Sequence, residues 1–183
     1  RLGNAAVLAA HVSTVNAVVV CGMPAIGISA SAATLVGNAL GAGKPQQAKH
    51  CCWLCVTLNL LIWTVIAVSL RTGRSVLAAT YTTDESVRQV MGSLLGIYAM
   101  AGFCDTTQNV MCGALRGIGR TRLAAFVYLV SYYGFMLPLG TMAFPLGLGV
   151  EGMWLSILLG TLLAMGIFAT VLVRTPWADL ADL

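Results

Sequence analysis

One acidic residue of this chain lies where chemistry is expected. Asp105 falls near the middle of a long apolar segment, whereas the other five Asp and Glu residues lie in connectors, at a helix end or in the C-terminal tail. A charged side chain at the centre of a bilayer costs about 2.5–3.5 kcal/mol on insertion scales, so such residues usually face a cavity and mark an ion or proton path. A carboxyl group in apolar surroundings is also easier to protonate. The alternative is a structural aspartate that hydrogen-bonds to a neighbouring helix.

Three polar residues share a helical face with Asp105. Gln108 and Asn109 follow it by three and four positions, and Tyr98 precedes it by seven. These spacings place side chains on one side of an α-helix. They predict a polar strip that binds a coupling cation or a substrate, with Asp105 and Gln108 as its main members. The alternatives are ordinary hydrogen bonds between helices and, for Tyr98, simple aromatic packing.

The elements that position this strip follow from composition. The 183 residues are 58% hydrophobic and 9% charged, and mean hydropathy is +0.88. Soluble domains carry about 25% charged residues, and a membrane-spanning helix needs about 20 apolar residues. The sequence therefore predicts an all-α polytopic membrane protein with five transmembrane helices. Their expected ranges are 7–36, 51–70, 89–115, 123–144 and 152–173.

Other kinds of site are not expected. The six cysteines fall within or at the edge of apolar runs and are interpreted as small hydrophobic residues, so no metal site or cofactor is predicted. No Ser/His/Asp set can be assembled, which argues against an enzyme. The ten Lys and Arg residues form no basic patch, which argues against nucleic-acid binding. His11 is either a proton relay or a histidine held by a hydrogen bond near the end of the first span.

Local signals describe how the spans begin, bend and end. Pro24 predicts a kink in the long first span, and the small residues after it predict close helix contact. Residues 38–45 predict a Gly-rich connector, and residues 71–88 a polar one that ends at the helix N-cap signal around Asp84. Pro138 interrupts the fourth span.

The basic residues predict an orientation. Six Lys and Arg residues lie on one side of the predicted spans and four, among them Arg1, on the other. The positive-inside rule places the first side in the cytoplasm, so residues 174–183 are predicted to form a cytoplasmic tail. An odd number of spans, an outside N-terminus and a chain that begins with Arg1 suggest a fragment of a larger protein.

Several blocks of the sequence resemble the multidrug and toxic compound extrusion (MATE) family. The blocks occur in family order over nearly the whole chain. They are Ala9 to His11 (AAH), Met23 to Ser29 (MPAIGIS), Val36 to Gly43 (VGNALGAG), Asp105 to Gln108 (DTTQ), Cys112 to Arg120 (CGALRGIGR), Tyr132 to Gly140 (YYGFMLPLG) and Gly152 to Trp154 (GMW). The motif positions carried over from the family are Pro24, Gly27, Gly37, Asn38, Gly41, Gly43, Arg116, Gly117, Gly119 and Pro138.

The resemblance implies an architecture and an activity. It implies helices eight to twelve of a twelve-helix, two-lobed transporter, without the N-terminal lobe and the seventh helix. Such transporters lie in a plasma or organellar membrane and export small organic cations, drugs or other xenobiotics in exchange for protons or sodium. Asp105 matches an acid on the tenth helix that is implicated in cation coupling or substrate binding. Some sodium-coupled members have a Tyr four residues before that acid, where this chain has Ala101.

Two alternatives stay open. One is a lipid or oligosaccharide flippase of related architecture, which basic residues lining a large cavity would favour. The other is a truncated product that does not transport.

Overall fold

Five long helices make up the computed structural model, which describes residues 4–182. Each is long and apolar enough to cross a membrane: Leu8–Gly41, Pro45–Tyr81, Glu85–Gly117, Thr121–Ala143 and Gly149–Arg174. The described residues contain no strand. The predicted all-α class with five spans is therefore confirmed. Arg1, counted above for orientation, lies outside the described residues.

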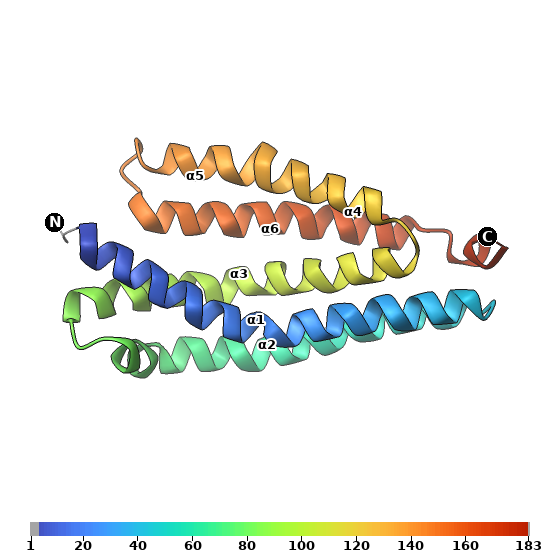
Figure 1. Cartoon of the computed structure of the whole chain (residues 1–183), viewed down its shortest axis with the longest axis horizontal. Coiled ribbons are helices and arrows are strands. Elements are labelled where there is room, and N and C mark those ends of the chain that lie inside the picture. The colour runs from blue at the N-terminus through green and yellow to red at the C-terminus, as the bar shows by residue number, and fades with distance from the viewer. Residues whose placement is uncertain (1–3, 183) are drawn as a thin grey trace.

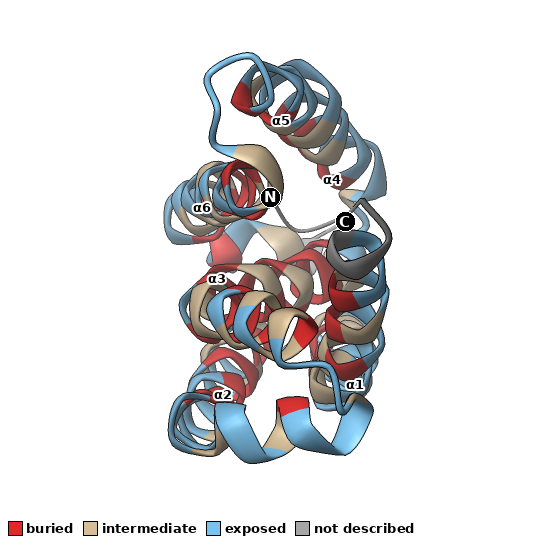
Figure 2. Cartoon of the chain, turned by 90° about the vertical axis from the view of Figure 1, so that its left-hand side faces the viewer, coloured by how far each residue is buried: buried red, intermediate tan, exposed pale blue. Residues whose placement is uncertain are grey.

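Helix α3 lies at the centre of the bundle. Figure 1 shows the long helices running side by side, and Figure 2 shows α3 stacked between α2 and α6 with α1 beside it. Close contacts join α3 to α1, α2 and α6. The elements in chain order are α1 (Asn4–Gly41), α2 (Pro45–Tyr81), α3 (Glu85–Gly117), α4 (Thr121–Tyr128), η1 (Leu129–Met136), α5 (Leu137–Ala143), α6 (Gly149–Arg174) and η2 (Trp177–Asp182).

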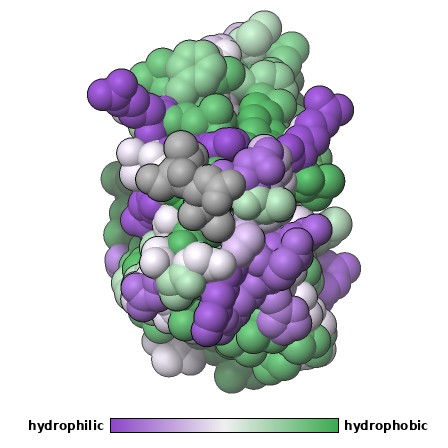
Figure 3. Space-filling view, turned by 90° about the vertical axis from the view of Figure 1, so that its right-hand side faces the viewer, coloured by the Kyte–Doolittle hydropathy of each residue, from purple (hydrophilic) through white to green (hydrophobic). Residues whose placement is uncertain are grey.

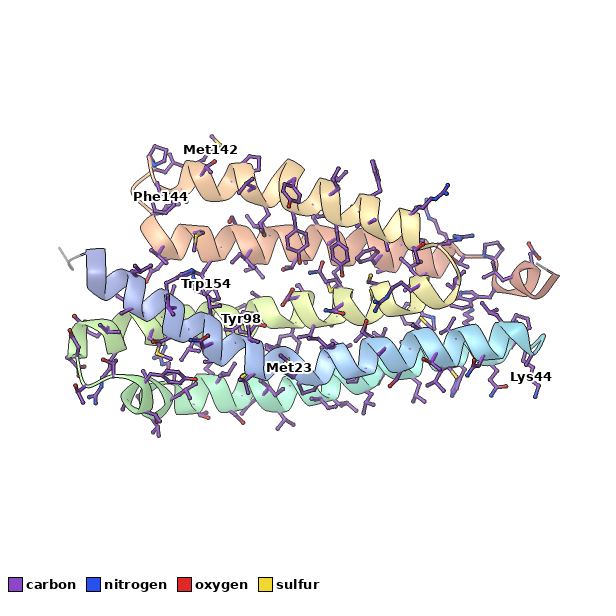
Figure 4. All side chains as sticks on the ribbon, viewed as in Figure 1. Met23, Lys44, Tyr98, Met142, Phe144 and Trp154 are labelled. Atoms are coloured by element: carbon purple, nitrogen blue, oxygen red, sulfur yellow. The ribbon has the colours of Figure 1, made fainter. Side chains whose placement is uncertain are left out.

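Helix α1 remains helical through Pro24 and bends there. Figure 1 shows the change of direction midway along α1, and Figure 4 places Met23 beside it. A proline inside a helix removes one backbone donor and crowds the preceding turn, which explains the bend.

Two predicted connectors are shorter than expected. Residues 38–41 belong to α1, which leaves a turn in which Gly43 has φ +68°. Residues 71–81 belong to α2, and only a short loop precedes α3. The length of an apolar run predicts only the part of a helix that crosses the hydrocarbon core of the membrane. Backbone hydrogen bonds continue the helix through the polar turns beyond that run, so the connectors are shorter than predicted.

Glycines let α1 and α3 cross closely. A Cβ on Gly113 would lie 2.2 Å from the carbonyl oxygen of Ser29, and one on Gly117 would lie 2.6 Å from that of Ala33. Gly37 faces Gly117 at the same crossing. By contrast, Gly27 and Gly41 would meet no atom within 4 Å.

Side chains also tie this crossing together. Arg116 Nη2 donates to Ser29 Oγ at 2.9 Å, and Ser29 Oγ donates to the carbonyl oxygen of Asn109 at 2.7 Å. Beyond the crossing, Gly119 has φ +83° in the turn that ends α3, and the exposed Asn38 accepts the backbone N–H of Ala42.

The fourth span is not one regular α-helix. Its middle segment, η1, is a π-helix, and the N–H of Leu137 donates to the carbonyl oxygen of Tyr132, five residues earlier. Pro138 follows in the first turn of α5, so the helix continues where the sequence predicted an interruption. A wider turn before the proline moves its ring away from the carbonyl with which it would clash.

Two apolar clusters fill the bundle, one toward each end. The first includes Trp63, Met91, Leu94, Leu95 and Trp154, and the second includes Val36, Cys52, Leu115, Phe168 and Leu172. The second cluster also takes in Trp177 of η2, which is buried and donates to the carbonyl oxygen of Leu172 at 3.1 Å. On α3 the two clusters are separated by residues 105–108, so polar side chains occupy the middle of the bundle.

Candidate functional site

Asp105 lies in the C-terminal half of α3, about one turn past its midpoint, and lines a cavity with residues of the fourth span. Its carboxylate accepts two hydrogen bonds from its own helix. Tyr98 Oη donates to Oδ2 at 3.4 Å, and Gln108 Nε2 donates to Oδ1 at 3.2 Å. The helical spacing of seven and three residues brings these groups to one face. Three of the four residues predicted for the strip are thus in direct contact.

The fourth span adds a residue that the sequence interpretation used only as a family motif. Gln108 Nε2 also lies 2.6 Å from Tyr132 Oη of η1, which accepts its hydrogen bond. Gln108 is nearly fully buried, with 1% of its surface exposed. Its amide therefore bridges α3 and η1 beside Asp105.

A cavity of about 770 Å³ opens next to this bridge. Its walls come from α3 on one side and from α4, η1 and the start of α5 on the other. Asn109 lines it with Asp105 and Gln108, so all but Tyr98 of the predicted strip reach the cavity. The remaining lining is aromatic and apolar: Ala125, Tyr128, Leu129, Tyr132, Tyr133, Met136 and Leu137.

The charge of Asp105 has no basic partner in the described part of the chain. The one ion pair in residues 4–182 joins Arg88 and Glu85, at 3.5 Å near the start of α3. No Lys or Arg lines the cavity. An unpaired carboxylate in an apolar site is costly, so a proton or a cation that enters the cavity stabilises it. This arrangement suits alternate binding of two positively charged species.

The opposite face of α3 carries a second polar contact. Asn59 of α2 donates to Thr106 Oγ1 at 3.1 Å and to Thr107 Oγ1 at 3.3 Å. All three side chains are buried. They belong to the same polar layer as Asp105 but lie away from the cavity lining, so they join α2 to α3 and do not reach the site.

Aromatic residues join Asp105 to one end of the bundle. Tyr98 packs edge-on against Trp154 of α6, with ring centroids 6.0 Å apart, and Figure 4 shows the two side chains close together. Trp154 Nε1 donates to His11 Nδ1 at 3.3 Å. His11 is therefore held by a hydrogen bond, as one of its two interpretations expected.

The aromatic wall could not be assigned from the sequence. Tyr128 and Tyr132 are four residues apart, a spacing that is equally typical of lipid contact or core packing. Only the packing of the fourth span across from α3 places their rings at the cavity. Gln108 and Asp105 were accessible to prediction because polar residues stand out inside an apolar run.

The described residues hold no cluster suited to a metal ion. No three His, Cys, Asp or Glu side chains in residues 4–182 gather closely enough to ligate one. The six cysteines are unpaired, and four of them are buried.

Comparison with known proteins relates the chain to membrane transporters. The MatE family model matches residues 1–142. An uncharacterised transporter of Schizosaccharomyces pombe is 32% identical over 87% of this chain and 30% of its own length. A probable multidrug resistance protein NorM of Xanthomonas axonopodis is 33% identical over 90% of this chain and 36% of its own. Multidrug and toxin extrusion protein 1 of Homo sapiens is 30% identical over 88% and 28%.

Solved structures share the fold. A crystal structure of a eukaryotic MATE transporter matches with a TM-score of 0.91 at 22% identity, over 99% of this chain and 41% of the other. An inward-facing multidrug resistance MATE transporter matches with a TM-score of 0.80 at 21% identity. The chain spans about a third of the length of the curated relatives described above.

Proposed function

Because this chain belongs to the MatE family of membrane transporters, we propose that it forms the C-terminal part of a secondary active antiporter. The complete protein exports organic cations, drugs or other xenobiotics in exchange for protons or sodium ions. Residues 1–173 correspond to helices eight to twelve of a two-lobed transporter, and residues 174–183 form a cytoplasmic tail. An N-terminal lobe and a seventh helix complete the protein.

The distribution of charge at the ends of the bundle supports this orientation. Figure 3 views the end at which α1 meets α2, and hydrophilic side chains lie across much of it. Lys44 lies at this end, as Figure 4 shows. Lys49, Arg116, Arg120 and Arg174 also flank the helix ends there. Basic residues are retained on the cytoplasmic side of membrane proteins.

One observation carries the proposed mechanism, namely that Asp105 lies at the wall of a cavity of about 770 Å³ and has no basic partner within residues 4–182. In an alternating-access cycle the two lobes rock around a central site. The ionised carboxylate attracts a cationic substrate on one side of the membrane. Protonation on the other side removes the charge and, with it, the attraction, so the substrate leaves.

A flippase is less well supported by the cavity. Transport of a phosphate-bearing lipid favours basic residues that pair with the phosphate. The cavity lining contains one acid, two amides and three tyrosines but no Lys or Arg. Its charge therefore suits a cation.

The proposal predicts that Asp105→Asn abolishes coupled export. The complete transporter is reconstituted in proteoliposomes, and movement of ethidium is followed by fluorescence under an imposed proton gradient and, separately, a sodium gradient. Because the amide has neither charge nor a titratable proton, gradient-driven movement of ethidium should fall to the rate of protein-free liposomes.

Asp84→Asn is the matched control, since it makes the same chemical change at an exposed aspartate outside the spans. It should transport like the unmodified protein. If Asp105→Asn keeps the export that either gradient drives in the unmodified protein, Asp105 has no role in coupling and the mechanism is wrong.

A further inference from the structure

The amide of Gln108 is incompletely hydrogen-bonded for so buried a group. Its Nε2 approaches both Asp105 and Tyr132, whereas its Oε1 is buried and has no hydrogen-bond partner. Buried polar atoms are nearly always paired, so each exception calls for an explanation. The oxygen and nitrogen of an amide have almost the same shape, and only the surrounding hydrogen bonds decide which occupies which position.

The two distances at Nε2 favour opposite orientations of the amide. The 2.6 Å separation from Tyr132 Oη is short for an N–H···O bond and typical of an O–H group that donates to a carbonyl oxygen. The 3.2 Å separation from Asp105 Oδ1 suits an N–H that donates to a carboxylate. Tyr132 thus favours the amide oxygen at this position, and an ionised Asp105 favours the nitrogen.

The charge on Asp105 decides between the two orientations. With the carboxylate ionised, the amide nitrogen donates to Oδ1 and to Tyr132 Oη. With Asp105 protonated, the amide reverses and its oxygen accepts from the carboxyl O–H and from the Tyr132 hydroxyl. Oδ2 already accepts from Tyr98, so the added proton belongs on Oδ1, which faces Gln108.

We propose that Gln108 transmits the protonation state of Asp105 to the π-helical segment η1 by reversing its side-chain amide. This inference rests on the proposed exchange of a proton and a substrate at Asp105. The reversal makes and breaks only hydrogen bonds, and the single proton involved reaches Asp105 from the water on one side of the membrane and leaves to the water on the other. Tyr132 accepts a hydrogen bond from Gln108 in the ionised state and donates one in the protonated state.

The hydrogen bond between Gln108 and Tyr132 links the two walls of the cavity, so reversal of the amide changes the groups that the cavity presents. The side-chain hydrogen bond from Gln108 to Tyr132 joins α3 to the α4–η1–α5 segment. These two elements are the walls of the cavity. When Tyr132 accepts from Gln108, its hydroxyl proton is free to point into the cavity. When Tyr132 donates to Gln108, it offers the cavity only lone pairs.

The surroundings leave Asp105 as the group that titrates. The nearby titratable groups are Tyr98, Cys104 and Cys112 on α3, Tyr128 on α4, and Tyr132 and Tyr133 on η1, with Cys21 of α1 next to Tyr98. Phenols and thiols carry no charge in acid solution. The cavity lining takes no residue from α2 or α6.

The test follows two groups at once in the complete transporter, without using transport as the readout. Fluorotyrosine at position 132 reports its hydroxyl environment by fluorine NMR, and the protonated carboxyl of Asp105 is followed by infrared difference spectroscopy against Asp105→Asn. Between acid and neutral pH the fluorine shift should follow the carboxyl band with the same midpoint. In Asp105→Asn the shift should no longer change with pH.

Gln108→Met decides whether the amide carries the signal, because Met has nearly the same shape but cannot accept and donate in turn. The carboxyl band should still titrate, while the fluorine shift at position 132 stays constant. Asn109→Leu, at the neighbouring lining residue, should keep the fluorine response. Fluorophenylalanine at position 132, which lacks only the hydroxyl, should abolish that response and serves if Gln108→Met does not fold.

The inference is overturned if position 132 still follows Asp105 in Gln108→Met, or if it shows no pH response in the unmodified protein. In the unmodified protein, a fluorine shift that does not follow the carboxyl band while ethidium export is intact would reject the relay and leave the proposed function standing. Unchanged export in Asp105→Asn would reject the proposed function, whatever the spectra show.

Discussion

Gly102 determines how closely α2 approaches α3 one turn before Asp105. A Cβ at this position would lie 1.7 Å from Cζ2 of Trp63. The indole is buried and donates from Nε1 to the carbonyl oxygen of Ala99 at 3.2 Å, so it has no room to withdraw. At the scale of single residues, the indole of Trp63 therefore packs directly against the backbone of Gly102 and holds the helix turn that precedes Asp105.

Gly102→Ala should destabilise the protein although alanine is the better helix former. Overpacking a filled core costs about 1–3 kcal/mol, which exceeds the roughly 1 kcal/mol that alanine gains over glycine in a helix. Gly92→Ala on the same helix, where a Cβ would meet nothing within 4 Å, should raise stability. Unfolding in mixed detergent, followed by tryptophan fluorescence, measures both. Equal effects of the two substitutions would show that Trp63 adjusts freely.

At the scale of elements, the existence of α3 and of the fourth span was predictable, but the internal geometry of the fourth span was not. Hydropathy located both, and the polar residues of α3 predicted which of its faces would line a site. The π-helical turns of η1 come just before Pro138 and pack against α6, and no local sequence pattern records them. Tyr132 is consequently visible in the sequence only as part of a family motif, and the position of η1 across from Gln108 makes it a candidate site residue.

The start of α3 is the element boundary that should respond to pH. Hydrogen bonds from the Ser86 hydroxyl, at 2.6 Å, and from its backbone N–H, at 2.9 Å, lower the pKa of the exposed Asp84. A lowered pKa adds stability above the unfolded pKa, and this stability is lost as pH falls through the folded value. We therefore expect the first turn of α3 to fray in acid.

Hydrogen exchange at the amides of residues 86–88 measures this fraying. Protection should fall as pH drops below the ordinary range of an aspartate, after correction for the intrinsic exchange rate. Asp84→Asn keeps a good capping side chain but has no titratable proton, so its protection should be independent of pH. A decline of the same size in both proteins would assign the effect to another group.

At the scale of the whole molecule, apolar segments packed around α3 explain most of the fold. Five apolar stretches required five helices, and that number was predictable from hydropathy alone. How the helices pack depends on which glycines lie at a helix contact. Gly113 and Gly117 do, whereas a Cβ on Gly27 would meet no atom within 4 Å. Which glycine meets a neighbour depends on the bend at Pro24 and on helix rotation, and neither can be read from the sequence.

The outer face of α1 exposes a row of small residues. Pro24, Gly27, Ala30, Ser31 and Thr34 are exposed along this face, and small residues in membrane helices usually pack against other helices. If the chain is part of a larger transporter, this face lacks its partners here. We therefore expect the 183-residue chain alone in detergent to unfold gradually on heating, whereas the complete transporter unfolds in one transition. Near-ultraviolet circular dichroism follows both, and a sharp transition of the isolated chain at the same temperature would contradict the expectation.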